Sequence, residues 1–127
     1  MTVSGCSSSN AEAVRDLMRF PIAPASDAIF NSVIYTNGQL ASSPQTDEQW
    51  HRLRAHAEAL RAAADQMVPL APEPNRAVWV RESAALASAA AAAAAASDAR
   101  SLDGVLDAGG KIYATCTACH AAYVARD

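Results

Sequence analysis

Alanine accounts for 32 of the 127 residues of this chain, more than any other residue. Alanine has the highest helix propensity of the amino acids, but it buries only a methyl group when helices pack. Such a sequence forms helices easily and fills the space between them poorly. We therefore expect a single all-α domain with a thin core, in which something other than side chains completes the interior.

Prolines and turn residues divide the chain into four helical regions. The first is interrupted by Pro21 and Pro24, which predict a kink or a break, with Ser26 as the N-cap of the second piece. Residues 1–9 are small and polar, so we expect a flexible tether there and a folded domain over residues 10–127. The expected helices cover residues 10–36, 46–68, 75–99 and 101 to near the C-terminus.

The second helical region has the clearest pattern. Thr46 and Gln49 have the spacing of a capping box at its start. Its inner face follows the alternating steps of three and four that are typical of bundle packing. The residues of this stripe are Trp50, Leu53, Ala57, Leu60, Ala64 and Met67. Short connections between long amphipathic helices imply antiparallel neighbours, so we predict an up-down-up-down four-helix bundle.

Two of the three cysteines lie in the pentapeptide Cys116-Thr117-Ala118-Cys119-His120. The pattern C-x-x-C-H is that of covalent c-type haem attachment. Residues three apart on a helix share one face, so both sulfurs can bond one porphyrin edge while the histidine ligates the iron. A redox or structural thiol pair and a metal site are the alternatives. A zinc site lacks a second pair of ligands at a suitable spacing, and a thioredoxin-like site lacks a βαβ context.

A single C-x-x-C-H near the C-terminus of a four-helix chain resembles the class II cytochromes c, the group of cytochrome c-prime and its low-spin relatives. The resemblance covers residue 10 to the end, and its specific part is Cys116, Cys119, His120 and Tyr123. It implies one haem c bound through the two cysteines on the C-terminal helix. Family members are often dimers through their first two helices, so the resemblance also implies a homodimer.

The geometry of an antiparallel bundle narrows the candidate residues for the sixth ligand of the iron. In an antiparallel bundle the end of the last helix lies beside the start of the first, the end of the second and the start of the third. The apolar residues expected at that end are Val14, Leu17, Met18, Met67, Val68, Val78 and Trp79. We expect Met18 to ligate the iron, with Met67 and an open distal face as the alternatives.

Several polar residues and glycines have expected positions relative to this site. Arg15 and Arg19 are expected to pair with the haem propionates, or else to be solvated charges. His51 and His56 lie toward the opposite end of their helix and are expected to be solvated or packed histidines. The pair Gly109-Gly110 costs on the order of 1 kcal/mol per glycine in a helix, so we expect the haem or a neighbouring helix to approach there.

The N-terminus indicates a location. Val3-Ser4-Gly5-Cys6 resembles the lipobox of bacterial lipoproteins, which implies a lipid anchor at Cys6, and the resemblance to c-type cytochromes implies export from the cytoplasm. No charged or apolar export region precedes the motif, so we expect the start of the sequence to be trimmed or assigned late. The expected location is the periplasm, with membrane tethering as a lipoprotein.

Together these features predict a monohaem c-type cytochrome that carries single electrons outside the cytoplasm between redox partner proteins. The alternative is a haem-based binder or sensor of a small gas, NO or CO, with an open distal site. No catalytic arrangement is visible, so we expect no enzymatic turnover. With 10 basic and 13 acidic residues, nucleic-acid binding is not expected. No apolar run reaches the roughly 18 residues of a membrane span.

Overall fold

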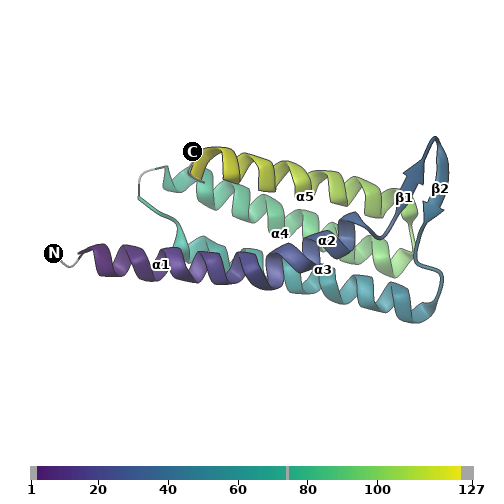
Figure 1. Cartoon of the computed structure of the whole chain (residues 1–127), viewed down its shortest axis with the longest axis horizontal. Coiled ribbons are helices and arrows are strands. Elements are labelled where there is room, and N and C mark those ends of the chain that lie inside the picture. The colour runs from purple at the N-terminus through teal and green to yellow at the C-terminus, as the bar shows by residue number, and fades with distance from the viewer. Residues whose placement is uncertain (1–2, 74, 124–127) are drawn as a thin grey trace.

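The chain is mostly helical, with one small two-stranded sheet (Figure 1). The computed structural model describes residues 3–73 and 75–123, with side chains from residue 10 onward. Helices make up 81% of the structure, which confirms the helical class expected from the alanine content. The four long helices are α1 (Val3–Leu17), α3 (Asp47–Met67), α4 (Arg76–Ala99) and α5 (Leu102–Tyr123).

The first helical region is broken, as its prolines predicted. After α1 the chain continues through an irregular π-helical turn, η1 (Met18–Ile22), into α2 (Ala23–Phe30). Phe20 leaves the helical conformation, with φ −162° and ψ 124°, because the residue before a proline is disfavoured in the α region. The backbone of α1 begins ahead of the expected start near residue 10. The side chains of residues 1–9 lie outside the described part, so the tether stays a prediction.

Ser26 is not the N-cap that the sequence predicted. It is buried inside α2, and its hydroxyl has no hydrogen-bond partner within the described part of the chain. The residue before α2, Ile22, already has helical dihedral angles of φ −62° and ψ −53°. The second helical piece therefore already begins after the break at Phe20, and Ser26 lies inside this piece and not at its N-terminus.

A β-hairpin follows α2. The expected extension of the first helical region to Thr36 is therefore wrong, because α2 ends at Phe30. Strand β1 (Ile34–Thr36) pairs antiparallel with β2 (Gln39–Ser42). Asn37 and Gly38 join them, with positive φ values of 53° and 79°. Two-residue hairpin turns require positive φ, which Asn-Gly adopts readily. Asn-Gly indicates a turn already in the sequence, but the strands beside it are too short to show a clear alternating pattern.

Helix α3 begins and packs as predicted. The Thr46 hydroxyl accepts a hydrogen bond from the Gln49 amide at 3.1 Å, and the Gln49 side chain accepts one from the Thr46 amide at 3.1 Å. This reciprocal pair confirms the capping box. All six residues of the expected inner stripe are buried, which confirms the packing face.

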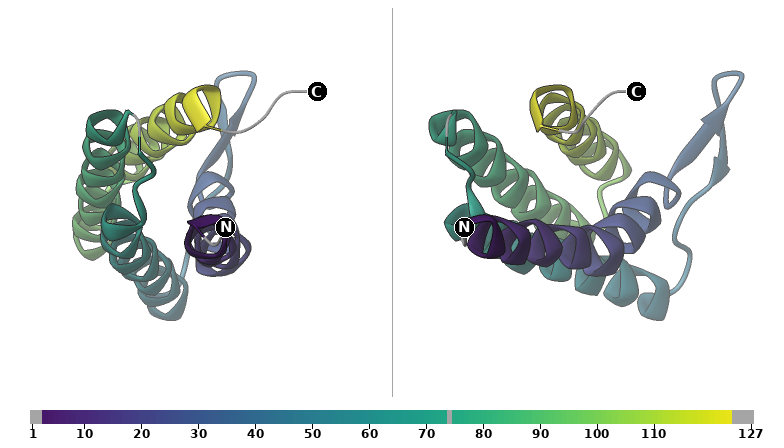
Figure 2. Two further views of the ribbon diagram at one scale, coloured as in Figure 1. Left: turned by 90° about the vertical axis from the view of Figure 1, so that its left-hand side faces the viewer. Right: turned by 60° about the vertical axis from the view of Figure 1, so that its left-hand side comes forward.

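Helix α4 packs against both α3 and α5 (Figure 2). Trp79 and Leu86 supply its bulky buried side chains, and small residues supply the rest of the buried surface. Most of the alanine tract 89–96 is buried, so this tract forms a helix interior face. None of the helices in the described residues combines the length and the apolarity needed to cross a membrane.

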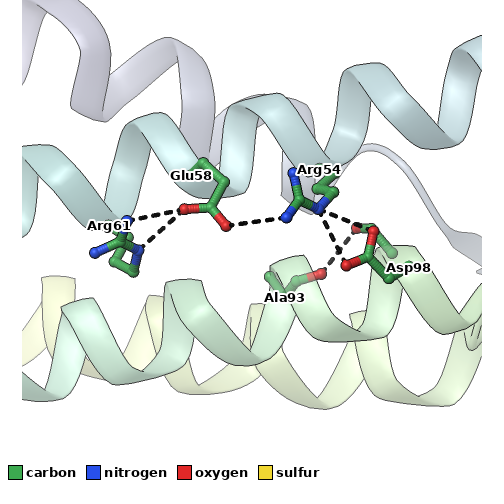
Figure 3. A network of polar contacts seen from close by, with 6 residues as sticks. Arg54, Glu58, Arg61, Ala93 and Asp98 are labelled. Carbon is green, nitrogen blue, oxygen red and sulfur yellow. Dashed lines mark hydrogen bonds and ion pairs between the residues drawn. The ribbon is translucent and has the colours of Figure 1, made fainter.

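Charged side chains line the outer edge of the interface between α3 and α4 (Figure 3). Arg61 pairs with Glu58 at 3.0 Å, and Glu58 pairs with Arg54 at 3.7 Å along α3. Arg54 then reaches across to Asp98 of α4 at 2.9 Å. Ion pairs at this exposure contribute little individually, and this series runs along α3 and reaches α4 at Asp98.

The N-terminal elements pack on the same scaffold from one side. Helix α2 contacts both α3 and α5, whereas α1 lies along α3 and contacts the short turn η2 (Val68–Leu70) (Figure 2). Helix α2 is therefore the N-terminal helix that contacts α5. Beyond the adjoining turn η1, α1 contacts α3 and η2.

The close approach between helices lies at Gly104 and not at Gly109-Gly110, where an approach of the haem stays a prediction. A Cβ atom on Gly104 would lie 2.9 Å from the Cβ of Ala96, near the junction of α4 and α5. A Cβ on Gly109 would meet only Phe30 at an ordinary 3.9 Å, and one on Gly110 would meet nothing within 4 Å. The packing of α5 on α4 therefore depends on Gly104.

Candidate haem-attachment site

Cys116, Cys119 and His120 all lie on the last two turns of α5. Both thiols are half-buried, and Cys116 packs against the hydrophobic core. His120 is exposed. The helix thus carries two half-buried sulfurs with an accessible imidazole beside them, the donor set that covalent attachment and axial ligation of one haem require.

The two thiols are not activated. Burial raises the pKa of Cys116 above its ordinary value, although a hydrogen bond with Thr115 lowers it in part. Burial, followed by the charge of Glu82 and the neighbouring Cys116, raises the pKa of Cys119 to about 11. Redox-active C-x-x-C motifs instead contain a cysteine whose pKa is lowered. This difference disfavours the reactive thiol pair.

The described side chains also give little support to the alternative of a metal site. Over residues 10–73 and 75–123, no group of three or more His, Cys, Asp or Glu side chains is arranged to hold a metal ion. His51 is exposed, and His56 lines a shallow pocket of about 250 Å³ beside the hairpin. Both histidines therefore lie away from the C-x-x-C-H motif, as the sequence predicted.

Tyr123 and Trp79 contact each other at the end of α5 that carries the motif. Their rings meet edge to face with centroids 5.0 Å apart. The Tyr123 hydroxyl donates to the carbonyl of Asn75, and the Trp79 indole donates to the carbonyl of Met67 at 2.6 Å. These contacts join the end of α3, the start of α4 and the end of α5. Of the residues expected at this end, Met67 and Trp79 are buried, while Val68 and Val78 are half-buried.

The expected residues of the first helical region face the same core. Val14, Leu17 and Met18 are half-buried and pack against it. Met18 opens the irregular turn η1, so its backbone does not continue the regular path of α1. Met18 and Cys116 thus border the same extended core from different elements: η1 packs against α1, α2 and α3, whereas α5 packs against α4 and α2.

The two arginines expected near the propionates are surface residues. Arg15 is exposed, and Arg19 forms an exposed ion pair with Asp16 at 3.6 Å. Both guanidinium groups lie on the same short stretch as Met18. Pairing with propionates stays a prediction for both.

One side of α5 carries apolar surface that the sequence analysis did not assign to a site. Tyr113 is 65% exposed, and its ring meets Phe30 of α2 edge to face at 6.2 Å. It lies three residues before Cys116 and seven before His120, so the three share one side of the helix. Phe20, at the break in the first helical region, is 74% exposed. The helical spacing of Tyr113 from Cys116 and His120 is the sequence signal that places it on the same side of the helix as the motif.

The side chains at this end of α5 fit a covalently bound haem. The thiols are spaced for two thioether bonds, the imidazole is free to ligate, and half-buried apolar residues and Tyr113 supply surface for a flat apolar ring. The chain matches no family model, no curated protein and no solved structure. The fold and the motif together therefore define its class: a helical protein with a C-x-x-C-H motif on its last helix.

Proposed function

We propose that this protein is a monohaem c-type cytochrome that carries single electrons. The observation that carries the proposal is the placement of Cys116, Cys119 and His120 on one helix, with both thiols half-buried and Cys116 packed against the core. When bound, the haem supplies one-electron chemistry by cycling its iron between the ferric and ferrous states. No residue needs to move a proton or form a bond to substrate for this function.

Each residue of the site has a part in holding the cofactor. Cys116 and Cys119 would anchor it through thioether bonds, and His120 would hold the iron on one side. Tyr123 and Trp79 keep the last turn of α5 in place through their ring contact and hydrogen bonds. Tyr113 offers an exposed aromatic surface beside the motif, where a partner protein can approach the cofactor edge.

The proposed architecture is the up-down-up-down four-helix bundle of the class II cytochromes c, with the haem on the C-terminal helix. Two contacts support the antiparallel pairing of α4 and α5: Trp79 at the start of α4 meets Tyr123 at the end of α5, and Ala96 lies close to Gly104. Because the alanine-rich core buries few large side chains, a cofactor held at the C-x-x-C-H end would add apolar area to it. Met18 is the proposed sixth ligand.

A gas-binding haem protein is the second candidate. The observation that favours it is that α1 packs against α3 and η2, while α2 is the N-terminal element packed on α5. If Met18 stays on α3 after haem attachment, the distal face is open to NO or CO. The two candidates therefore differ in the sixth coordination position.

The location proposed from the sequence remains outside the cytoplasm, in the periplasm and tethered through Cys6. Haem attachment to C-x-x-C-H in bacteria takes place there, which is the reason for this part of the proposal. The side chain of Cys6 lies outside the described residues. Redox partner proteins and a homodimer are part of the same proposal.

Absorption spectra of the purified protein, made in a host that attaches haem c, test the function. We expect a Soret band and a sharp low-spin α band on reduction, with no change under CO. A broad high-spin spectrum that shifts with CO would instead establish the gas-binding candidate.

The matched control is the double variant C116A/C119A made in the same host. It keeps His120 and the rest of the helix but loses both sulfurs, so we expect no Soret band after purification. A wild-type protein with no Soret band would contradict both candidates.

A further inference from the structure

The contacts between α4 and α5 fix which residues lie opposite each other. Trp79 meets Tyr123 at one end of the interface, and Ala96 lies against Gly104 at the other. Between these points the two helices run antiparallel. One helical turn inward from the contact of Trp79 with Tyr123, Glu82 therefore lies on the turn of α4 that is opposite Cys119 of α5, the second cysteine of the motif.

Glu82 is sheltered from solvent. Its side chain is 15% exposed, compared with 69% for the adjacent Arg81, whose Nε lies 3.3 Å from the Glu82 carboxylate. Its negative charge is also one of the causes of the raised pKa of Cys119, which independently indicates that the two groups are close. A sheltered charge is screened less by solvent and salt than a surface charge.

We propose that Glu82 lowers the reduction potential of the haem by placing a negative charge beside the Cys119 attachment point. The inference rests on the proposed function. Ferric haem carries one more positive charge than ferrous haem, so a nearby carboxylate stabilises the ferric state relative to the ferrous state. Arg81 offsets this effect only in part, because its guanidinium is largely in solvent.

The test is the midpoint potential of the holoprotein with the substitution Glu82→Gln, which keeps the shape of the side chain and removes its charge. We expect a shift to more positive potential, equal to about a three- to tenfold change in the electron-exchange equilibrium with a reference mediator. Arg81→Gln should shift the potential in the opposite direction and by less. Melting temperatures and visible spectra verify that both variants keep the wild-type fold and ligation.

The matched control is Glu48→Gln, which removes the same charge from an exposed position in the first turn of α3. It should leave the midpoint potential within error of wild type. As a second readout, the infrared difference spectrum between oxidised and reduced wild type should contain a carboxylate band that is absent in Glu82→Gln and retained in Glu48→Gln.

Two results would overturn the inference while the proposed function stands: a haem-loaded Glu82→Gln protein with the potential of the Glu48→Gln control, or a shift to more negative potential. A wild-type protein that binds no haem overturns the proposed function itself. The two failures are therefore distinguished by the haem content of the wild-type sample.

Discussion

Tyr123 and Trp79 are the residues that give the end of α5 a defined position. Tyr123 is tied to the backbone of Asn75, and Trp79 is tied to the backbone of Met67, so the last turn of α5 is held to both neighbouring elements. The sequence singled out Tyr123 by a resemblance and Trp79 by its size. Their contact depends on the register of two helices, which no local pattern specifies. For the same reason the position of Glu82 opposite Cys119 could not be predicted.

Met18 decides between the two candidate functions, because these differ in whether the iron has a sixth ligand from the protein. In the holoprotein we expect Met18→Ala to convert a six-coordinate low-spin spectrum to a high-spin one that responds to CO, because the thioether ligand is lost. Absorption spectra in both oxidation states measure the change. Val14→Ala is the control: it truncates a half-buried neighbour on the same face and should leave the spectrum low-spin. An unchanged Met18→Ala spectrum would exclude Met18 as the ligand.

The elements were predictable where local chemistry defines them. The capping box at Thr46 lies within four residues, and the apolar stripe of α3 repeats over the whole helix, so both could be predicted from sequence. The break before Pro21 was also predicted, because proline restricts the residue before it. The hairpin was missed since its strands are three and four residues long. Ser26 was misassigned because the second helical piece begins directly after Phe20, several residues before Ser26.

Two glycines of α5, Gly104 and Gly110, have different surroundings and give a paired prediction. Gly104→Ala should lower the free energy of unfolding by about 1 kcal/mol or more, because the new methyl group would lie 2.9 Å from a fixed Cβ on α4. Gly110→Ala should raise it by about 0.5–1 kcal/mol, because the position is open and alanine favours the helix. Denaturant unfolding followed by circular dichroism measures both. Equal effects of the same sign would contradict the packing described for Gly104.

For the whole molecule, the alanine content has a structural consequence. The interface between α3 and α4 buries mostly methyl groups, and the larger apolar residues gather at a few positions such as Trp50, Leu60 and Trp79. The thin core expected from composition is what the structure has. At the end of α5 that carries the C-x-x-C-H motif, Cys116 and Tyr123 are half-buried residues packed against the core. A covalently held ring there would add the apolar area that the side chains do not supply.

The central claim is that Cys116 and Cys119 bind a haem covalently. The intact mass of the denatured protein, made in a host that matures c-type cytochromes, tests it most directly. The account predicts the mass of the polypeptide plus one haem, and the mass of the polypeptide alone for the C116A/C119A variant. A wild-type chain with no added mass, from cells in which a reference c-type cytochrome is fully matured, would contradict the account.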